Sequence, residues 1–250
     1  MSESEILAHA EERIRRHRTA DVVLKLVDDR GRPVTDAEVH VRLKRHAFKI
    51  GCNAFRLFTI EDDEMQAAYD EQFTDLFNYA NLPFYWGSYE RDRGQTQQER
   101  LEHMVDWATA RGIEVKGHPL AWHEVFPGWA EELEDREVIE RLERRVGGIV
   151  SAFRNRIDIW HVFNEATVSH RHDNAIGRWV GANRPASCVA QALMWARAAN
   201  PDAVLLYNDF NISAEFEELM EQLVAHDAPV DVVGVQSHMH CGPWPTERLW

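Results

Sequence analysis

Short apolar segments alternate with longer amphipathic segments from residue 48 onward, and this alternation constrains the fold more than any other feature of the chain. The short segments predict strands at residues 48–52, 80–86, 113–118, 157–163, 203–208 and 230–237. The longer segments predict helices at about residues 61–77, 97–111, 135–153, 186–199 and 214–225. Strands that alternate with helices pair in parallel through right-handed crossovers, so we predict an α/β fold on a parallel sheet.

Polar and aromatic side chains gather at the C-terminal ends of several of these strands. They include Trp86, His118, Asn164, Asn208 and Gln236. In a (β/α)8 TIM barrel all strand ends open onto one face, where barrel active sites lie, whereas an open doubly wound sheet binds its ligand at one switch point. No G-x-G-x-x-G or P-loop pattern follows any of the strands, which argues against a nucleotide. We therefore predict a TIM barrel.

The predicted strands fall short of a complete barrel. A barrel needs eight strands, yet only the six named above precede residue 238, and residues 247–250 read as the start of a helix. We therefore expect an incomplete barrel of about six βα units, cut short before strand seven. Because open sheet edges and a half-covered core are unfavourable, we expect the 250-residue chain to fold poorly alone.

The first 45 residues carry a different pattern. Residues 2–18 read as a charged amphipathic helix, and alternating apolar positions at 22–27 and 39–43 flank a turn that contains Gly31. The second pattern predicts a β-hairpin. We therefore divide the chain into an N-terminal helix and β-hairpin extension, residues 1–45, and a barrel domain, residues 46–250.

Composition narrows the class of partner. Lys plus Arg number 28 and Asp plus Glu number 42, so the net charge is 28 − 42 = −14, which argues against nucleic acid and anionic membranes. No run approaches the ~20 apolar residues of a membrane span, and the N-terminus lacks the apolar stretch of a secretory signal. Either the protein stays in the cytoplasm or its leader is absent from this chain. The nine tryptophans suit an aromatic cleft of the kind that binds sugars.

Four short motifs stand at strand ends. They read G-H-P-L-A-W-H at residues 117–123, W-H-V-F-N-E at 160–165, Y-N-D-F-N at 207–211 and Q-S-H at 236–238. Together they resemble glycoside hydrolase family 10, whose members are mostly endo-β-1,4-xylanases and carry these motifs, in this order, after strands three to six. The resemblance covers about residues 48–238. It implies a TIM barrel that cleaves β-1,4-xylan or a related xylan-derived glycan.

The resemblance also implies a retaining mechanism, in which two carboxyl groups stand about 5–5.5 Å apart. By residue match Glu165 is the general acid/base, which protonates the glycosidic oxygen and then activates water. Asn164 is expected to bond the 2-hydroxyl of the sugar, and His238 to hydrogen-bond the nucleophile. The other matched residues, expected to line the substrate site, are His118, Trp122 and Gln236, with Asn208 and Asp209 nearer the leaving group.

Strand two departs from the family pattern. The family carries E-N-x-x-K-W there, whereas this chain reads N-L-P-F-Y-W at residues 81–86, so only Trp86 is shared. Tyr85 places a phenol where the family has an ammonium group, and Leu82 cannot hydrogen-bond through its side chain. We expect Asn81, Tyr85 and Trp86 to line a more aromatic sugar site that favours a decorated or shorter xylan fragment.

The second catalytic carboxylate does not match any residue of the chain. The family's nucleophile is a Glu on strand seven, and Glu247 follows strand six too closely to be that residue. We therefore expect the nucleophile to lie beyond residue 250 and the 250-residue chain alone to be inactive.

Two alternatives stay open beside an enzyme with a poly- or oligosaccharide substrate. The first is a non-catalytic or partner-completed glycan-binding barrel, which the changes on strand two make conceivable. The second is a metal-dependent barrel hydrolase, suggested by His170-x-His172 and His238-x-His240. Because His170 and His172 lie in a polar stretch, where surface histidines are common, we expect no metal and no cofactor. Zinc bound in stoichiometric amount would favour the second alternative.

Overall fold

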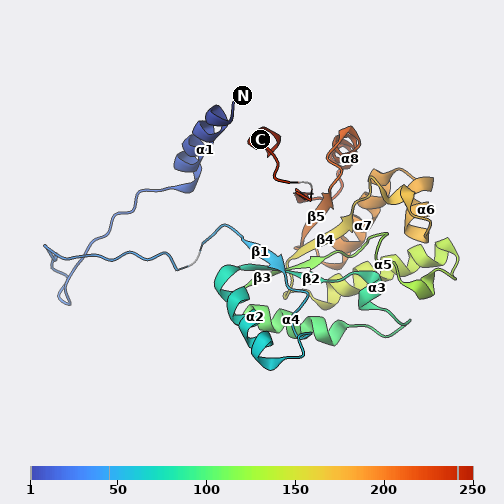
Figure 1. Cartoon of the computed structure of the whole chain (residues 1–250), viewed down its shortest axis with the longest axis horizontal. Coiled ribbons are helices and arrows are strands. Elements are labelled where there is room, and N and C mark those ends of the chain that lie inside the picture. The colour runs from blue at the N-terminus through green and yellow to red at the C-terminus, as the bar shows by residue number, and fades with distance from the viewer. Residues whose placement is uncertain (1, 45, 241, 250) are drawn as a thin grey trace. The chain divides into compact units, whose positions relative to one another are not determined.

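The computed structural model describes residues 2–44, 46–240 and 242–249. The chain divides into two compact units, one of residues 46–237 and one of residues 1–45 together with 238–250 (Figure 1). The assignment of residues 238–250 to the barrel domain stays a prediction. Each unit is described below by itself.

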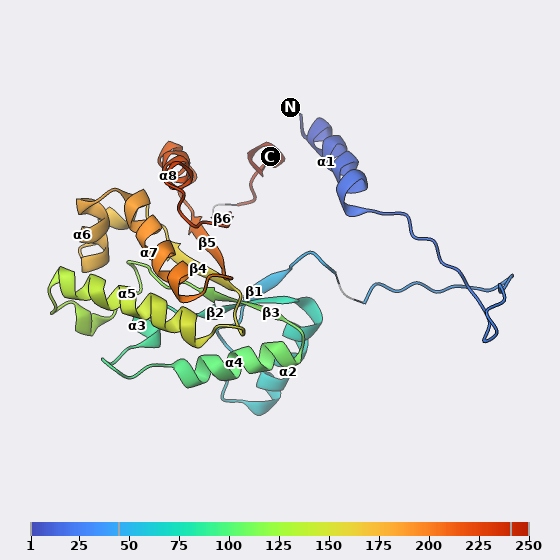
Figure 2. The ribbon, with the colours of Figure 1, turned by 180° about the vertical axis from the view of Figure 1, so that it is seen from behind.

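The larger unit is built on one sheet of six strands. Every strand pairs in parallel with its neighbour, in the order β1-β2-β3-β4-β5-β6. The strands are β1 (Gly51–Asn53), β2 (Tyr79–Pro83), β3 (Glu114–His118), β4 (Ile159–Asn164), β5 (Val204–Asp209) and β6 (Val232–Val235). The sheet curls into half a barrel (Figures 1 and 2). This confirms the predicted α/β fold and the incomplete (β/α)8 barrel.

Helices connect the strands. They are α2 (Asp63–Leu76), α3 (Trp86–Tyr89), α4 (Gln98–Ala110), α5 (Asp135–Ala152), α6 (Ala175–Ala182), α7 (Pro185–Ala199) and α8 (Ala214–Ala225), with 3-10 turns η1 (Gly128–Ala130) and η2 (Ser169–Arg171). The sequence pattern predicted all of these α-helices except α3 and α6, which are 4 and 8 residues long and too short for a clear helical period. None of the described helices has both the length and the apolar character that crossing a bilayer requires.

The second strand is shorter than predicted. Residues 84–86 were expected to continue the second strand, but β2 ends at Pro83 and Trp86 is the first residue of α3. The backbone N–H of Tyr89 donates to the carbonyl of Tyr85 at 2.8 Å, and this bond closes a helical turn. The chain therefore leaves the sheet after Pro83, and Trp86, the one residue shared with the family pattern here, begins a helix.

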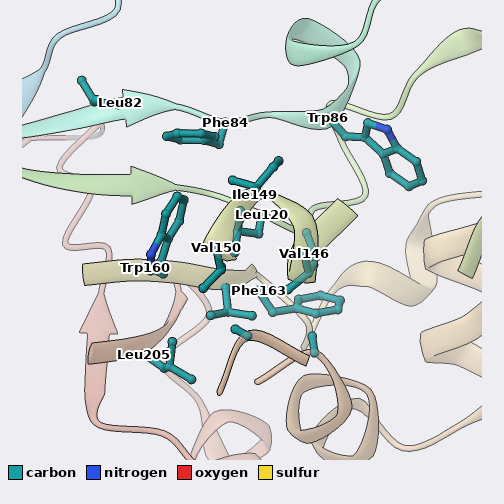
Figure 3. Packing of buried hydrophobic residues seen from close by; sticks show 14 of the residues in the cluster. Leu82, Phe84, Trp86, Leu120, Val146, Ile149, Val150, Trp160, Phe163 and Leu205 are labelled. Carbon is teal, nitrogen blue, oxygen red and sulfur yellow. The ribbon is translucent and has the colours of Figure 1, made fainter. Parts of the chain in front are cut away.

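The core lies between the sheet and the helices that cover its outer face. Along β2 and β3 buried residues alternate with half-buried ones, as a sheet with two different faces requires. Figure 3 shows side chains of β2 and β4, and of the segments after β2 and β3, packed against α5. The residues of this layer include Leu82, Phe84, Trp160, Val146, Ile149 and Val150. The alternate positions, such as Lys116 and His118, therefore face the inside of the half-barrel.

A buried arginine of α5 holds the segments that follow two strands. Arg145 donates to the carbonyl of Phe84 through Nη2 and to the carbonyl of Leu120 through Nε at 3.4 Å. Its guanidinium group lies over the two aromatic rings of α3, 4.8 and 5.8 Å from their centroids. Burial lowers the pKa of Arg145 only to about 10, so the group stays charged near neutral pH. These contacts fix the chain next to Tyr85 and Trp122.

In the smaller unit the described residues form two helices, α1 (Glu3–Arg18) and α9 (Thr246–Leu249). At the start of α1 the side chains and backbones of Ser2 and Glu5 bond reciprocally, which is a capping box. The hydroxyl of Thr246 donates to the carboxylate of Glu3 at 2.9 Å. The predicted N-terminal helix is therefore confirmed.

The predicted β-hairpin is wrong beyond its turn. The N–H of Asp28 donates to the carbonyl of Arg32 at 2.9 Å, and a single antiparallel bridge joins Val27 to Pro33. On either side of this bridge, the described residues from 19 to 44 form no strand. A two-stranded hairpin needs a packed apolar face, whereas valines such as Val23 are exposed here.

Gly117 of β3 cannot carry a side chain without displacement of the core. It pairs with Trp160 on β4, and a Cβ atom at Gly117 would lie 2.2 Å from Cε3 and Cζ3 of the indole. We expect Gly117→Ala to lower the free energy of unfolding by about 1–3 kcal/mol, the range for an overpacked core. Urea unfolding followed by circular dichroism measures this change.

The matched control for this substitution is Gly148→Ala on α5, where nothing lies within 4 Å of the new Cβ atom. There alanine is expected to raise the free energy of unfolding by about 0.5–1 kcal/mol, because glycine weakens a helix interior. If Gly117→Ala were as stable as the unchanged protein, the packing of Trp160 on β3 would be contradicted.

Candidate active site

Glu165 is the first residue after β4, and its backbone is left-handed, with φ at 58°. Its N–H donates to the carbonyl of Asn208 at 2.9 Å, and its carbonyl accepts from the Ser169 hydroxyl at 3.2 Å. A residue other than glycine in this conformation costs on the order of 1 kcal/mol and persists only where its surroundings hold it. The end of the β4–β5 ladder and the following turn therefore fix the direction in which this side chain leaves the sheet.

The Glu165 carboxyl group accepts one hydrogen bond on each oxygen. Trp122 Nε1 donates to Oε2 at 3.0 Å, and Gln236 Nε2 donates to Oε1 at 2.7 Å. The same Gln236 amide nitrogen donates to Asn164 Oδ1 at 3.0 Å. Glu165 is only 7% exposed. The structure thus brings together four of the predicted site residues, from the segments after β3 and β6 and the end of β4.

A buried carboxylate on β5 holds the turn behind Glu165. Asp209 Oδ2 accepts from the Tyr207 hydroxyl at 2.6 Å and from the Thr167 hydroxyl at 2.9 Å. The Tyr207 hydroxyl accepts in turn from the N–H of Ala166 at 3.2 Å. Asp209 is fully buried. These contacts hold the residues directly after Glu165. The place expected of Asp209 near the leaving group stays a prediction.

Two imidazoles and a phenol form a chain of hydrogen bonds inside the half-barrel. Burial lowers the pKa of His118 to about 3 and that of His161 well below its ordinary value, so both rings are neutral near pH 7. The carbonyl of Phe163 can only accept, so His161 carries its proton on Nε2, which lies 3.0 Å away. His161 Nδ1 then accepts from His118 Nδ1 at 2.7 Å.

The direction of this chain determines the role of Tyr85. Because His118 donates through Nδ1, its Nε2 is an acceptor, and the Tyr85 hydroxyl donates to it at 2.9 Å. Burial and the nearby Glu165 carboxylate raise the pKa of Tyr85 to about 12, which keeps the phenol protonated. The Tyr85 ring lies 5.5 Å from that of Trp122. Tyr85 therefore joins the aromatic side of the site and keeps its oxygen as an acceptor for a ligand hydroxyl.

Two other predicted residues lie apart from this cluster. Asn81, on β2, donates through Nδ2 to Asn53 Oδ1 at 2.9 Å. Trp86 is only 3% exposed, donates to Glu90 at 3.1 Å and packs edge-on against Trp129. Neither contact involves Glu165. Their part in substrate binding stays a prediction.

Asn208 and His238 complete the predicted set. Asn208 accepts from the Glu165 N–H through its backbone, and its side chain lies against Gly234 of β6, where a Cβ atom would be 2.6 Å from Oδ1. His238 belongs to the smaller unit, where its ring is stacked on that of His240 at 4.9 Å between centroids. The catalytic part expected of His238 stays a prediction.

His161 is the site residue that the sequence analysis did not select. It is the second residue of the W-H-V-F-N-E motif and is fully buried. Its signal in the sequence is a titratable residue inside an otherwise apolar strand. Only the pairing of β3 with β4 reveals that this residue meets His118.

The neutral imidazoles give the stability of the protein a pH dependence. Between about pH 6.5 and pH 3 the unfolded chain binds protons at His118 and His161 that the folded chain excludes. Stability is therefore expected to fall as the pH decreases through this window, by about 1.4 kcal/mol per pH unit for each histidine. Urea unfolding between about pH 7 and pH 4.5 measures the slope. His118→Gln is expected to reduce it by one histidine's share, and an unchanged slope would contradict the buried, neutral state of His118.

Known proteins resemble the chain in sequence. Endo-1,4-beta-xylanase B of Thermotoga neapolitana is 35% identical over 162 residues, which are 62% of this chain and 46% of that protein. Endo-1,4-beta-xylanase B of Paenibacillus barcinonensis is 33% identical over 155 residues, 56% of this chain and 46% of that protein. The chain therefore spans about half the length of these relatives.

Solved structures resemble it in fold. Xylanase 10B of Thermotoga petrophila, crystallised with xylobiose, superposes with a TM-score of 0.64 at 26% identity, over 76% of this chain and 59% of that one. Native xylanase 10B of Thermotoga maritima gives 0.64 at 27% identity, over 76% and 60%.

The family model agrees with both comparisons. The model of glycosyl hydrolase family 10 matches residues 42–249, a range that contains all four motifs and every residue of the Glu165 cluster. The chain therefore belongs to glycosyl hydrolase family 10.

Proposed function

We propose that the protein is a retaining glycoside hydrolase that cleaves β-1,4-xylan or a xylan-derived glycan, with Glu165 as the general acid/base. The observation that carries the proposal is the Glu165 carboxyl group, held between Trp122 and Gln236 beside the ring of Tyr85. The names of the relatives, which are endo-1,4-beta-xylanases, support the substrate class. The xylobiose bound to the Thermotoga petrophila enzyme supports an oligosaccharide ligand.

In this proposal Glu165 transfers a proton in both steps of the reaction. It gives its proton to the glycosidic oxygen as the bond to the sugar breaks, and it then takes one from the water that completes hydrolysis. The bonds from Trp122 and Gln236 hold the carboxyl group in one orientation during both transfers. We assign the nucleophile to no residue of this chain.

Neighbouring groups recognise the sugar. Asn164 uses its Oδ1 to accept from Gln236, which leaves its amide N–H groups as the donors for a sugar hydroxyl. The Tyr85 hydroxyl donates a hydrogen bond to His118, and its oxygen can accept one from a sugar hydroxyl. Trp122 and Tyr85 supply the aromatic surface against which a sugar ring packs.

The proton-transfer role predicts a loss that depends on the leaving group. Glu165→Gln keeps the size of the side chain but removes its acid, so kcat/KM on xylo-oligosaccharides is expected to fall about 10²–10⁴-fold. An aryl xyloside with an acidic phenol as leaving group needs little protonation, so its kcat/KM is expected to fall much less. Both values are measured on the complete gene product, with release of reducing sugar and of phenol as the signals.

Glu217→Gln, on the exposed face of α8, is the matched control and is expected to leave both values unchanged. Equal losses on the two substrates would contradict a role in leaving-group protonation. Binding of xylo-oligosaccharides without any hydrolysis by the unchanged protein would favour the glycan-binding alternative.

Tyr85 stands where the family pattern has a lysine, so we expect this protein to choose substrates differently from members that carry the lysine. We propose that the phenol favours shorter or decorated xylan fragments. Tyr85→Lys is expected to raise the ratio of kcat/KM on plain long xylan to that on xylotriose about 10-fold, the value of one hydrogen bond to a substrate hydroxyl. Tyr85→Phe, which keeps the ring and removes the hydroxyl, separates ring packing from hydrogen bonding. An unchanged ratio in Tyr85→Lys would contradict this role.

A further inference from the structure

A second histidine of the G-H-P-L-A-W-H motif has an unusual surrounding. His123 is only 1% exposed, and its Nδ1 lies 2.7 Å from the Ser169 hydroxyl. The Ser169 hydroxyl donates a hydrogen bond to the carbonyl of Glu165 at 3.2 Å. Because a hydroxyl has one hydrogen to donate, its oxygen accepts from His123 Nδ1. The proton of the neutral imidazole is therefore on Nδ1, and Nε2 carries a lone pair.

Among the residues that the structure describes, His123 Nε2 has no hydrogen-bond partner. Burial, with His172 nearby, lowers the pKa of His123 to about 3, so the ring does not remove the problem by protonation near neutral pH. A buried polar atom without a partner is costly, and native proteins rarely leave one. An imidazole whose other nitrogen donates to an oxygen is the usual form of a metal-bound histidine.

Two further side chains that can bind a metal, those of Glu124 and His172, lie close to His123. The rings of His123 and His172 lie 4.1 Å apart between centroids, and His172 Nε2 lies 4.0 Å from Glu124 Oε1. One ligand atom from each of the three residues lies within 4.8 Å of the others. Ligands of a tetrahedral zinc ion at about 2.0–2.1 Å stand about 3.4 Å apart. The partly exposed side chains of Glu124 and His172 can close this difference.

Contacts to the backbones of His123 and His172 hold the loops after β3 and β4 together. Asn174 Nδ2 donates to the carbonyl of His123 at 2.8 Å, so the start of α6 is bound to the loop after β3. Gly177 packs directly on the backbone of His172, where a Cβ atom would lie 2.0 Å from the carbonyl oxygen. The relative positions of His123 and His172 are therefore set by contacts that do not require an ion.

We propose that His123, Glu124 and His172 bind one divalent transition-metal ion of the zinc class, with a water molecule as the fourth ligand. The ion joins the loop after β3, which carries Trp122, to the loop after β4, which carries Glu165. Its role is to stabilise these loops, and it takes no part in the proton transfers at Glu165. The sequence pattern suggested His170 with His172 as a possible ligand pair, and we expected no metal there. In the folded protein His172 lies beside His123 instead. The proposal does not depend on the substrate of the enzyme.

The test measures zinc binding to the complete gene product. The protein is treated with a chelator, dialysed and titrated with Zn²⁺ by calorimetry, and its melting temperature is recorded with and without the metal. We expect one Zn²⁺ per chain and a rise in melting temperature of about 5–10 °C at roughly 100 times the Kd. Co²⁺ in place of Zn²⁺ is expected to show the intense visible absorption of a four-coordinate site.

Substitutions of the partly exposed ligands distinguish binding at this site from binding at other histidines. His172→Ala and Glu124→Gln are expected to weaken Zn²⁺ binding at least about tenfold and to remove the Co²⁺ spectrum, while the metal-free melting temperature stays unchanged. His170→Ala, an exposed histidine two residues away, is the matched control and is expected to bind like the unchanged protein. Absence of stoichiometric binding would overturn the proposal, as would equal binding by His172→Ala or an equal loss in His170→Ala.

Discussion

The hydrogen bonds at the end of the β4–β5 pairing determine where the Glu165 carboxyl group lies. The bond from the Glu165 N–H to the Asn208 carbonyl holds the backbone as it leaves the sheet. Next to it the buried Asp209 accepts from Tyr207 and Thr167, and so anchors the residues that follow. A carboxyl group buried this deeply is tolerated only when it is hydrogen-bonded, and here its partners include the turn behind the candidate catalytic residue. Loss of this contact would release the turn and the carboxyl group together.

The left-handed backbone of Glu165 is one consequence of this constraint. An unstrained turn would not bring the side chain of this residue between Trp122 and Gln236, and the contacts on both sides of Glu165 offset the strain. Three loops meet at this carboxyl group, from β3, β4 and β6. The site is therefore a property of the parallel sheet, because only parallel strands bring all of their C-terminal ends to one edge.

The histidines illustrate a second principle. His118 and His161 are close in space because β3 and β4 are neighbours. The hydrogen bond between them places the proton of His118 on Nδ1, so Nε2 accepts from the Tyr85 hydroxyl. His123 and His172 meet because the loops after the same two strands are bound together by Asn174. Spacing along the chain pointed instead to His170 with His172. A short interval in sequence is weaker information than the adjacency of strands, since a polar loop can point consecutive side chains in different directions.

The sequence by itself determined the order of strands and helices, the curled parallel sheet and the strand ends at which Glu165, Asn164, Trp122 and Gln236 stand, because hydrophobic periodicity is a local property. It did not predict α6, whose eight residues are too few for a clear period, and it predicted a hairpin that lacks the packed face it requires. Only the tertiary structure decided that Trp86 turns into α3, that His161 orders the proton on His118, and that Asp209 positions the turn after Glu165. The last two of these facts depend on hydrogen bonds between buried residues more than 40 positions apart, and no local pattern encodes them.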